Sequence, residues 1–183
     1  MHSLTLRTAV QIVAIVVWMR HFGGAARTFS RAKGEVPSRL IYCFTLAIVI
    51  LVFGSFNAPF ERRMAVPGLI GLVGSIVLFE WARQSVRGKV FSYIFSNDTP
   101  EFLWTSGPYV YIRNPFYASY LLSYFAAAIM FPGIPSLIVV VGMTIYFNAA
   151  AQHEERKFER SPLATEYEAY RRRTGRFIPR LRR

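Results

Sequence analysis

Polar residues of the kind that bind small molecules gather in two stretches of the sequence. The first, residues 104–117 (WTSGPYVYIRNPFY), surrounds an arginine and an asparagine with tyrosines. The second, residues 153–179, opens with a histidine and two glutamates and continues through tyrosines and arginines. A carboxylate accepts hydrogen bonds from hydroxyl or amino groups, an arginine can bind a carboxylate through two parallel hydrogen bonds, and an aromatic face attracts a cation. A site for a small polar ligand can be built from these groups.

Both stretches also have a purely structural interpretation. Pro115 suits the first turn of a helix, and Arg113 with its neighbouring tyrosines fits a membrane boundary and an aromatic belt. The two glutamates fit a solvated helix face, and Ser161-Pro162 predicts the start of a second helix in the tail. On that helix an apolar stripe at spacings of four and three is typical of packing: Leu163, Tyr167 and Tyr170. On pattern alone the structural interpretation is preferred.

The composition indicates a membrane protein of about one domain. Of the 183 residues 53% are hydrophobic and only 17% are charged, whereas a soluble domain carries roughly 25% charged residues. A single cysteine, Cys43, and three histidines far apart in sequence argue against a disulfide framework, a cysteine-based zinc or iron–sulfur site and a histidine metal cluster. No metal site is expected.

Long apolar runs define the elements that position the two stretches. Residues 4–19, 40–58 and 64–82 are candidate spans, and residues 114–152 are 39 residues without a charge. One helix of that length would reach about 58 Å, nearly twice the thickness of a bilayer core. Phe131-Pro132-Gly133-Ile134-Pro135 breaks the run into a hairpin. The predicted fold class is therefore an all-α polytopic membrane protein with about five transmembrane helices and a helical carboxyl-terminal tail.

The basic residues predict how the chain lies in the membrane. If the tail is cytoplasmic, residues 20–39, 83–113 and 152–183 lie inside and hold 19 of the 22 lysines and arginines, while Arg7, Arg62 and Arg63 lie outside. Such an asymmetry follows the positive-inside rule, so we expect the amino terminus outside and the carboxyl terminus in the cytoplasm. The distribution also favours contact with anionic lipids over nucleic acid as the reason for the net charge of +12.

A family resemblance joins the two polar stretches. Gly107-Pro108-Tyr109, followed by Arg113-Asn114-Pro115-Phe116-Tyr117, resembles the signature G-P-Y-x-x-x-R-H-P-x-Y of the isoprenylcysteine carboxyl methyltransferase-like and phospholipid methyltransferase membrane proteins. The tail is similar to theirs in its glutamate pair, in an E-Y-x-x-Y motif at residues 166–170 and in a closing Phe177-Ile178-Pro179. The resemblance covers residues 104–180. Asn114 departs from it, because it stands where the pattern usually has histidine and cannot become cationic.

The resemblance implies a methyltransferase that uses S-adenosylmethionine at the cytoplasmic surface. One membrane domain, residues 1–183, would comprise spans one to three with a connecting loop (residues 1–103) and a cofactor-binding half (residues 104–183). The resemblance places six residues around the cofactor: Tyr109, Arg113, Asn114, Tyr117, Glu154 and Glu155. We add Gly107, Tyr167 and Tyr170 of the same motifs to the predicted cofactor site, and we predict Arg113, Glu154 and Arg173 as the catalytic residues.

The acceptor is expected to reach such a site from the bilayer. A lipidic or lipid-anchored molecule can meet a water-soluble cofactor only at the interface. For a carboxylate acceptor, Arg113 or Arg173 would orient the substrate, and for an amine, Glu154 or His153 would take a proton. The sequence does not choose between carboxylate, amine and thiol, and it leaves the oligomeric state open.

Two other functions compete with this interpretation. The carboxyl-terminal half also resembles NADPH-dependent sterol and steroid reductases, but residues 116–120 (FYASY) lack the asparagine and glutamate usual there. A non-enzymatic scaffold with a basic tail on anionic lipids is the third possibility. Two further expectations concern single elements: Glu80 pairs with Arg83 near the interface, and Asn148 makes an interhelical hydrogen bond. The loop at residues 85–103 has no assigned role.

Overall fold

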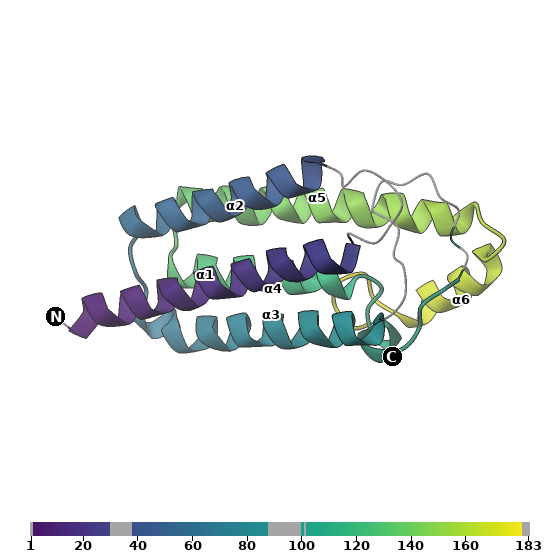
Figure 1. Cartoon of the computed structure of the whole chain (residues 1–183), viewed down its shortest axis with the longest axis horizontal. Coiled ribbons are helices and arrows are strands. Elements are labelled where there is room, and N and C mark those ends of the chain that lie inside the picture. The colour runs from purple at the N-terminus through teal and green to yellow at the C-terminus, as the bar shows by residue number, and fades with distance from the viewer. Residues whose placement is uncertain (1, 30–37, 88–99, 101, 181–183) are drawn as a thin grey trace.

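The protein is a bundle of five long helices with a short sixth helix at one end (Figure 1). The computed structural model describes residues 2–29, 38–87, 100 and 102–180. For residues 2–5, 26–29 and 38–41 it describes the backbone only. The helices are α1 (His2–Phe29), α2 (Ser38–Asn57), α3 (Ala65–Ser85), α4 (Pro115–Met130), α5 (Ile134–Glu159) and α6 (Ala164–Arg173). Two short 3-10 helices, η1 (Arg62–Met64) and η2 (Gly107–Val110), precede α3 and α4.

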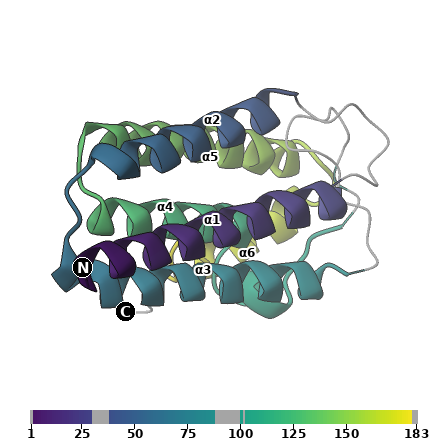
Figure 2. The same ribbon diagram turned by 60° about the vertical axis from the view of Figure 1, so that its left-hand side comes forward.

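The helices form two layers. Helix α2 lies along α5, while α1, α3 and α4 lie side by side beneath them (Figures 1 and 2). The predicted all-α fold and the five apolar helices are confirmed. By length and composition, segments 6–25, 62–85 and 134–159 are each able to cross a membrane, and 42–57 and 115–130 are shorter apolar helices. Helix α1 runs to Phe29, ten residues beyond the predicted end of the first span.

The predicted hairpin break is confirmed at the turn between α4 and α5. The Phe131 backbone amide still donates to Ala127, and the Phe131 carbonyl accepts a 2.6 Å hydrogen bond from the Ser136 hydroxyl. Pro135 stands in the first turn of α5, where a missing N–H costs nothing. The turn returns the chain along α4, so both ends of the hairpin lie at the same end of the bundle (Figure 1). We call that end the motif end and the turn the hairpin end.

Helices α3 and α4 make the most extensive helix pair in the bundle. A Cβ atom added at Gly71 would lie only 2.9 Å from the Ala126 Cβ, closer than packed side chains tolerate. Glycine there lets the two backbones approach, as small residues do in membrane helix pairs. This close pair gives the start of α4 a rigid neighbour at the motif end.

Polar contacts at the hairpin end close the carboxyl terminus of α2. The Arg7 guanidinium donates to three carbonyls there: Ser55, Phe56 (2.8 Å) and Ala58 (3.0 Å). Gln11 donates to the Ser55 hydroxyl at 2.9 Å. Helix ends leave carbonyls without intrahelical partners, and a cation placed there satisfies them and interacts favourably with the helix dipole.

Candidate functional site

The loop before α4 and the tail after α6 meet through their backbones. Ile112 and Gly175 form an isolated parallel bridge. The Arg113 amide donates to the Gly175 carbonyl at 2.8 Å, and the Gly175 amide donates to Tyr111 at 3.1 Å. Asn114, the residue before α4, donates its own amide to Arg176 at 3.1 Å. The two sequence motifs, about sixty residues apart, are therefore held side by side, as the hairpin predicted.

Side chains reinforce this meeting through one buried carboxylate. Arg113 Nε donates to Glu155 Oε1 at 3.1 Å, and Arg176 donates to both Glu155 oxygens, at 3.1 and 2.8 Å. The remaining groups extend the network: Arg113 Nη1 reaches the Thr174 carbonyl at 2.6 Å, and Arg176 Nη1 reaches Asn148 Oδ1 at 2.6 Å. We call Arg113, Asn148, Glu155 and Arg176 the clamp.

The clamp is buried enough for its pairing to matter. The side chains of Arg113 and Glu155 are 10% and 8% exposed, so neither charge can be solvated fully by water. Bidentate and charge-assisted hydrogen bonds of this kind are the strong ones in proteins. Removing one partner of a buried ion pair typically costs about 3–5 kcal/mol, because the other charge stays buried and unpaired. The clamp therefore fixes the motif end.

Helix α6 packs its two tyrosines against that end. Tyr167 stacks on Phe158 with ring centroids 4.8 Å apart, and the Tyr170 hydroxyl donates to the Tyr109 carbonyl at 2.7 Å. The predicted packing stripe on this helix is confirmed for both tyrosines, which are 3% exposed. The helix begins at Ala164 instead of Ser161-Pro162. Ser161 caps a preceding turn, since its hydroxyl accepts the Leu163 amide at 3.1 Å.

A second carboxylate, Glu154, faces a different environment from its neighbour Glu155. Glu154 is partly buried and lies within electrostatic range of the phenols of Tyr109 and Tyr117. Burial, and then the nearby Tyr170 phenol and Glu154 carboxylate, raise the pKa of Tyr109 above its usual range. The Tyr109 hydroxyl is a hydrogen-bond donor at neutral pH, as an ordinary tyrosine is, and its raised pKa extends this to strongly alkaline pH. Tyr117 is held in place by stacking on Phe147, with ring centroids 5.0 Å apart.

Gly107 brings η2 into close contact with the end of α3. Its φ of +59° lies in the left-handed region that favours glycine, and a Cβ there would overlap the Ser85 side chain. Glycine thus sets the position of the following Pro108 and Tyr109. Among the predicted cofactor residues, Gly107 contributes only a backbone conformation and no side chain.

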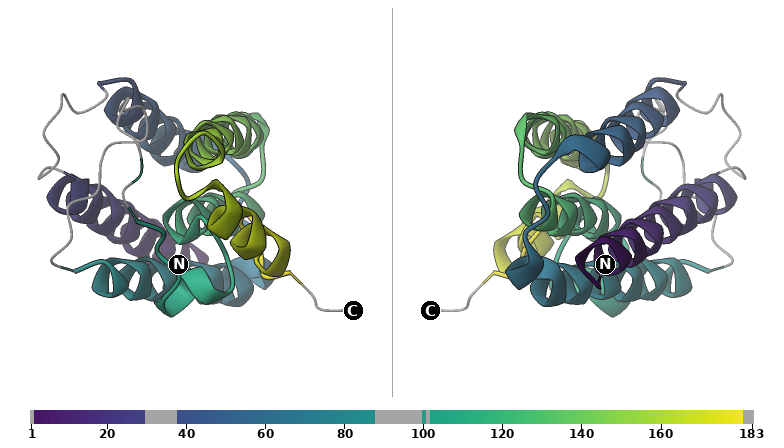
Figure 3. Two further views of the ribbon diagram at one scale, coloured as in Figure 1. Left: turned by 90° about the vertical axis from the view of Figure 1, so that its right-hand side faces the viewer. Right: turned by 90° about the vertical axis from the view of Figure 1, so that its left-hand side faces the viewer.

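Two other predicted residues, Arg173 and Asn114, lie nearer the surface of the motif end. Arg173 is exposed, with its guanidinium carbon 5.9 Å from the centroid of the Tyr170 ring. The Asn114 side chain is partly buried, and its Nδ2 lies 3.5 Å from the Arg176 carbonyl, a long hydrogen bond. All nine predicted cofactor residues and Arg173 therefore belong to the motif end. Figure 3 shows α6 beside α4 and α5 there.

Sequence reasoning missed two members of the clamp. Arg176 belonged to the recognised tail motif, but no role was assigned to it. The expected interhelical hydrogen bond of Asn148 is wrong, because its side-chain oxygen accepts from Arg176 of the tail, which lies outside the helices. The expected pair of Glu80 with Arg83 is confirmed at 2.6 Å, and Arg20 of α1 also binds Glu80 at 2.7 Å. Most of the loop at residues 85–103 lies outside the described residues.

Comparison with known proteins agrees with this arrangement. The sequence profile of the family named Phospholipid methyltransferase matches residues 62–162, more than half of the chain. The chain belongs to the phospholipid methyltransferase family. It is thus a membrane methyltransferase of a family that acts on lipids. The match begins at η1 and so includes α3, which the sequence motifs did not, and it ends before α6. A search among characterised proteins finds no match.

Proposed function

We propose that this phospholipid methyltransferase family member transfers a methyl group from S-adenosylmethionine to a lipidic acceptor at the motif end. One observation carries the proposal: Glu154 lies within electrostatic range of the phenols of Tyr109 and Tyr117, and it is adjacent in sequence to Glu155 of the clamp that fixes both recognised motifs. The uneven distribution of basic residues supports a cytoplasmic motif end, where the cofactor is available.

The residues at this end fit the chemistry of that cofactor. A partly buried carboxylate such as Glu154 can accept hydrogen bonds from ribose hydroxyls or pair with an amino group, and aromatic faces can contact a sulfonium. Arg173 is exposed and can bind the carboxylate of the methionine part. Arg113 and Glu155 bind one another, so we assign them as positioning residues that hold Tyr109, Asn114 and Tyr117 in place.

The reaction asks little of the protein beyond alignment. S-adenosylmethionine supplies a methyl group already activated on a sulfonium. The residues here would hold the two reactants and exclude water, and the Tyr109 hydroxyl would donate a hydrogen bond. For an amine acceptor, Glu154 is the carboxylate placed to take the proton, and for a carboxylate acceptor no base is needed.

Ligand-induced stabilisation tests the proposal on the intact protein. We expect S-adenosylhomocysteine to raise the melting temperature of the detergent-solubilised protein, because binding at a hundred times the Kd stabilises the native state by about 2.7 kcal/mol. Methyl-labelled cofactor with lipid vesicles would then give labelled lipid. A melting temperature unchanged at millimolar ligand, or raised by NADPH instead, would overturn the assignment.

A further inference from the structure

Four polar side chains inside the bundle have few or no hydrogen-bond partners among the described residues. They are Trp18 and His21 on α1 and Tyr120 and Tyr124 on α4. Each is at most 3% exposed. A backbone group of Ser75 lies within hydrogen-bonding reach of the His21 ring, so the indole N–H and the two phenol hydroxyls are the donors without any partner among the described residues.

These side chains are neighbours, and we call them the donor cluster. The rings of His21 and Tyr120 meet edge to face with centroids 5.3 Å apart. Tyr120 and Tyr124 are one helical turn apart, and both contact Phe44 of α2, at 4.6 and 6.1 Å between ring centroids. Trp18 stands one turn before His21 on the same helix. The cluster therefore spans the space between α1 and α4.

Leaving these groups without partners is costly. A buried polar group without a hydrogen bond costs roughly 1–3 kcal/mol. The surrounding rings cannot satisfy them, since Phe79 lies 4.9 Å from His21, and Phe147 lies 5.6 Å from Tyr120. Buried polar groups in native proteins are nearly always paired. Several unpaired donors in one place therefore point to a ligand that supplies the missing acceptor.

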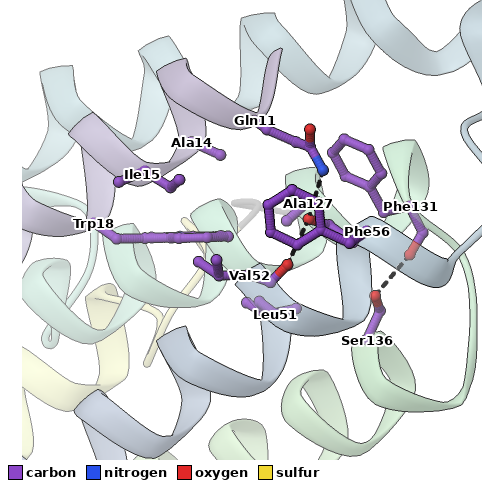
Figure 4. A pocket seen from close by; sticks show the side chains of 11 residues that line it. Gln11, Ala14, Ile15, Trp18, Leu51, Val52, Phe56, Ala127, Phe131 and Ser136 are labelled. Atoms are coloured by element: carbon purple, nitrogen blue, oxygen red, sulfur yellow. Dashed lines mark hydrogen bonds between the residues drawn. The ribbon is translucent and has the colours of Figure 1, made fainter. Parts of the chain in front are cut away.

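The cluster lies between the candidate site and an apolar pocket. On one side, Tyr117 is one turn from Tyr120 and within electrostatic range of both Tyr120 and Glu154. On the other side, Trp18 lines a narrow apolar pocket with room for about one water molecule (Figure 4). Helices α1 and α2 contribute most of its apolar wall: Ala14, Ile15, Leu51, Val52 and Phe56. A polar group bound at the cluster would thus lie between the candidate site and this pocket.

We propose that the donor cluster binds an oxygen atom of the lipidic methyl acceptor. The inference rests on the proposed function. An indole N–H, two hydroxyls and a histidine offer hydrogen atoms, and none of the four supplies a negative charge for an ammonium group. These donors suit an oxygen acceptor, either a lipid ester carbonyl or the carboxylate of a prenylated thioether acid.

Trp18 itself provides a readout that needs no activity. In a Trp81→Phe, Trp104→Phe background it is the remaining tryptophan. Titration with dioleoyl phosphatidylethanolamine, its dialkyl ether analogue or a farnesylated thioether carboxylate in detergent should shift its emission. We expect Tyr120→Phe and Tyr124→Phe each to weaken binding about fivefold, the loss of one hydrogen bond. Tyr42→Phe, a matched change at a tyrosine 70% exposed on α2, should have no effect.

The outcomes separate this inference from the proposed function. S-adenosylhomocysteine should stabilise both phenylalanine variants as well as it stabilises the parent. Weaker binding of the ether analogue than of the diester would identify the ester carbonyl, and tight binding of the farnesylated acid alone would identify a carboxylate. Equal affinities in Tyr120→Phe, Tyr124→Phe and the parent would overturn the inference, as would a lowered melting temperature in both. A failure of S-adenosylhomocysteine to bind would overturn the proposed function, and a lipid that still binds at the cluster would then not be a methyl acceptor.

Discussion

The clamp and the donor cluster are both polar groups buried in an apolar bundle, yet they are satisfied in opposite ways. In the clamp, Arg113 and Arg176 share one carboxylate, and the leftover donors reach Asn148 and the Thr174 carbonyl. In the donor cluster, the hydroxyls of Tyr120 and Tyr124 reach no acceptor among the described residues. Such groups add to stability when paired and subtract from it when unpaired.

This difference separates a structural region, the clamp, from a region that we propose binds a ligand, the donor cluster. The clamp is complete without a ligand, so its members hold the loop and the tail together. The donor cluster lacks acceptors among the described residues, so its hydroxyls lower the stability of the free protein, and our proposal assigns it to ligand binding. The proposed function places Glu154, adjacent to Glu155 in sequence, in the binding region as well. Stability measurements on matched variants can test this division.

The largest effect is expected at the shared carboxylate. Glu155→Gln keeps the shape of the side chain but removes the charge between Arg113 and Arg176. It should lower the free energy of unfolding by about 3–5 kcal/mol, because two guanidinium groups then lose their counter-charge. Thermal unfolding in detergent would measure the loss. Glu159→Gln, whose carboxylate is 46% exposed, is the matched control. Equal melting temperatures for the two variants would show that the clamp is not structural.

The next effect is expected at the contact between η2 and α3. Gly107→Ala forces a side chain onto a backbone with φ of +59° and against Ser85. We expect a loss of about 2 kcal/mol or more in stability, from the backbone conformation and the overlap together. Adding Ser85→Gly should recover the part due to overlap. Gly142→Ala, at a helical site with nothing within 4 Å, should be neutral or stabilising.

One substitution made in both regions should change stability in opposite directions. Tyr170→Phe removes the hydroxyl that donates to Tyr109 and should cost about 1 kcal/mol. Tyr124→Phe removes a buried hydroxyl without a partner among the described residues and should gain about 1 kcal/mol. Differential scanning of the two variants side by side gives the sign directly. Destabilisation by Tyr124→Phe would mean that its hydroxyl is already paired.

The smallest effect is expected on the outer face of α6. Arg172 is 78% exposed and pairs with Glu168 across one turn at 3.1 Å. Exposed pairs of this kind are weakened by water and salt. Arg172→Ala should leave the melting temperature and cofactor binding unchanged. A clear loss of either would extend the structural region to the surface of the tail.

The sequence predicted the parts of this architecture that follow from local pattern. Apolar runs predicted the helices, and Pro132-Gly133 predicted the turn of the hairpin. The hairpin in turn predicted that Arg113 and Glu155 lie close together, as they do. Long-range register was not predictable in the same way. The pairing of Arg176 with Asn148 depends on how the tail crosses α5, and no periodicity encodes that crossing.

The donor cluster shows the same limit more sharply. From the sequence, His21 is expected at the membrane boundary, because the first apolar run ends at Met19 and is followed by Arg20. In the structure α1 continues to Phe29, and His21 is fully buried against Phe79 and Tyr120. Which helix lies opposite α1 is a property of the packed bundle, so the meeting of α1 with α4 could not be predicted from either segment.

Cofactor titration of Glu154→Gln tests the central claim most directly. Isothermal titration with S-adenosylmethionine would compare the variant with the parent protein in the same detergent. The site described here predicts at least about tenfold weaker binding, since a hydrogen bond to a charged group contributes roughly 1.5–3 kcal/mol, with the melting temperature of the ligand-free protein unchanged. Binding as tight as that of the parent, in a variant that remains folded, would contradict it.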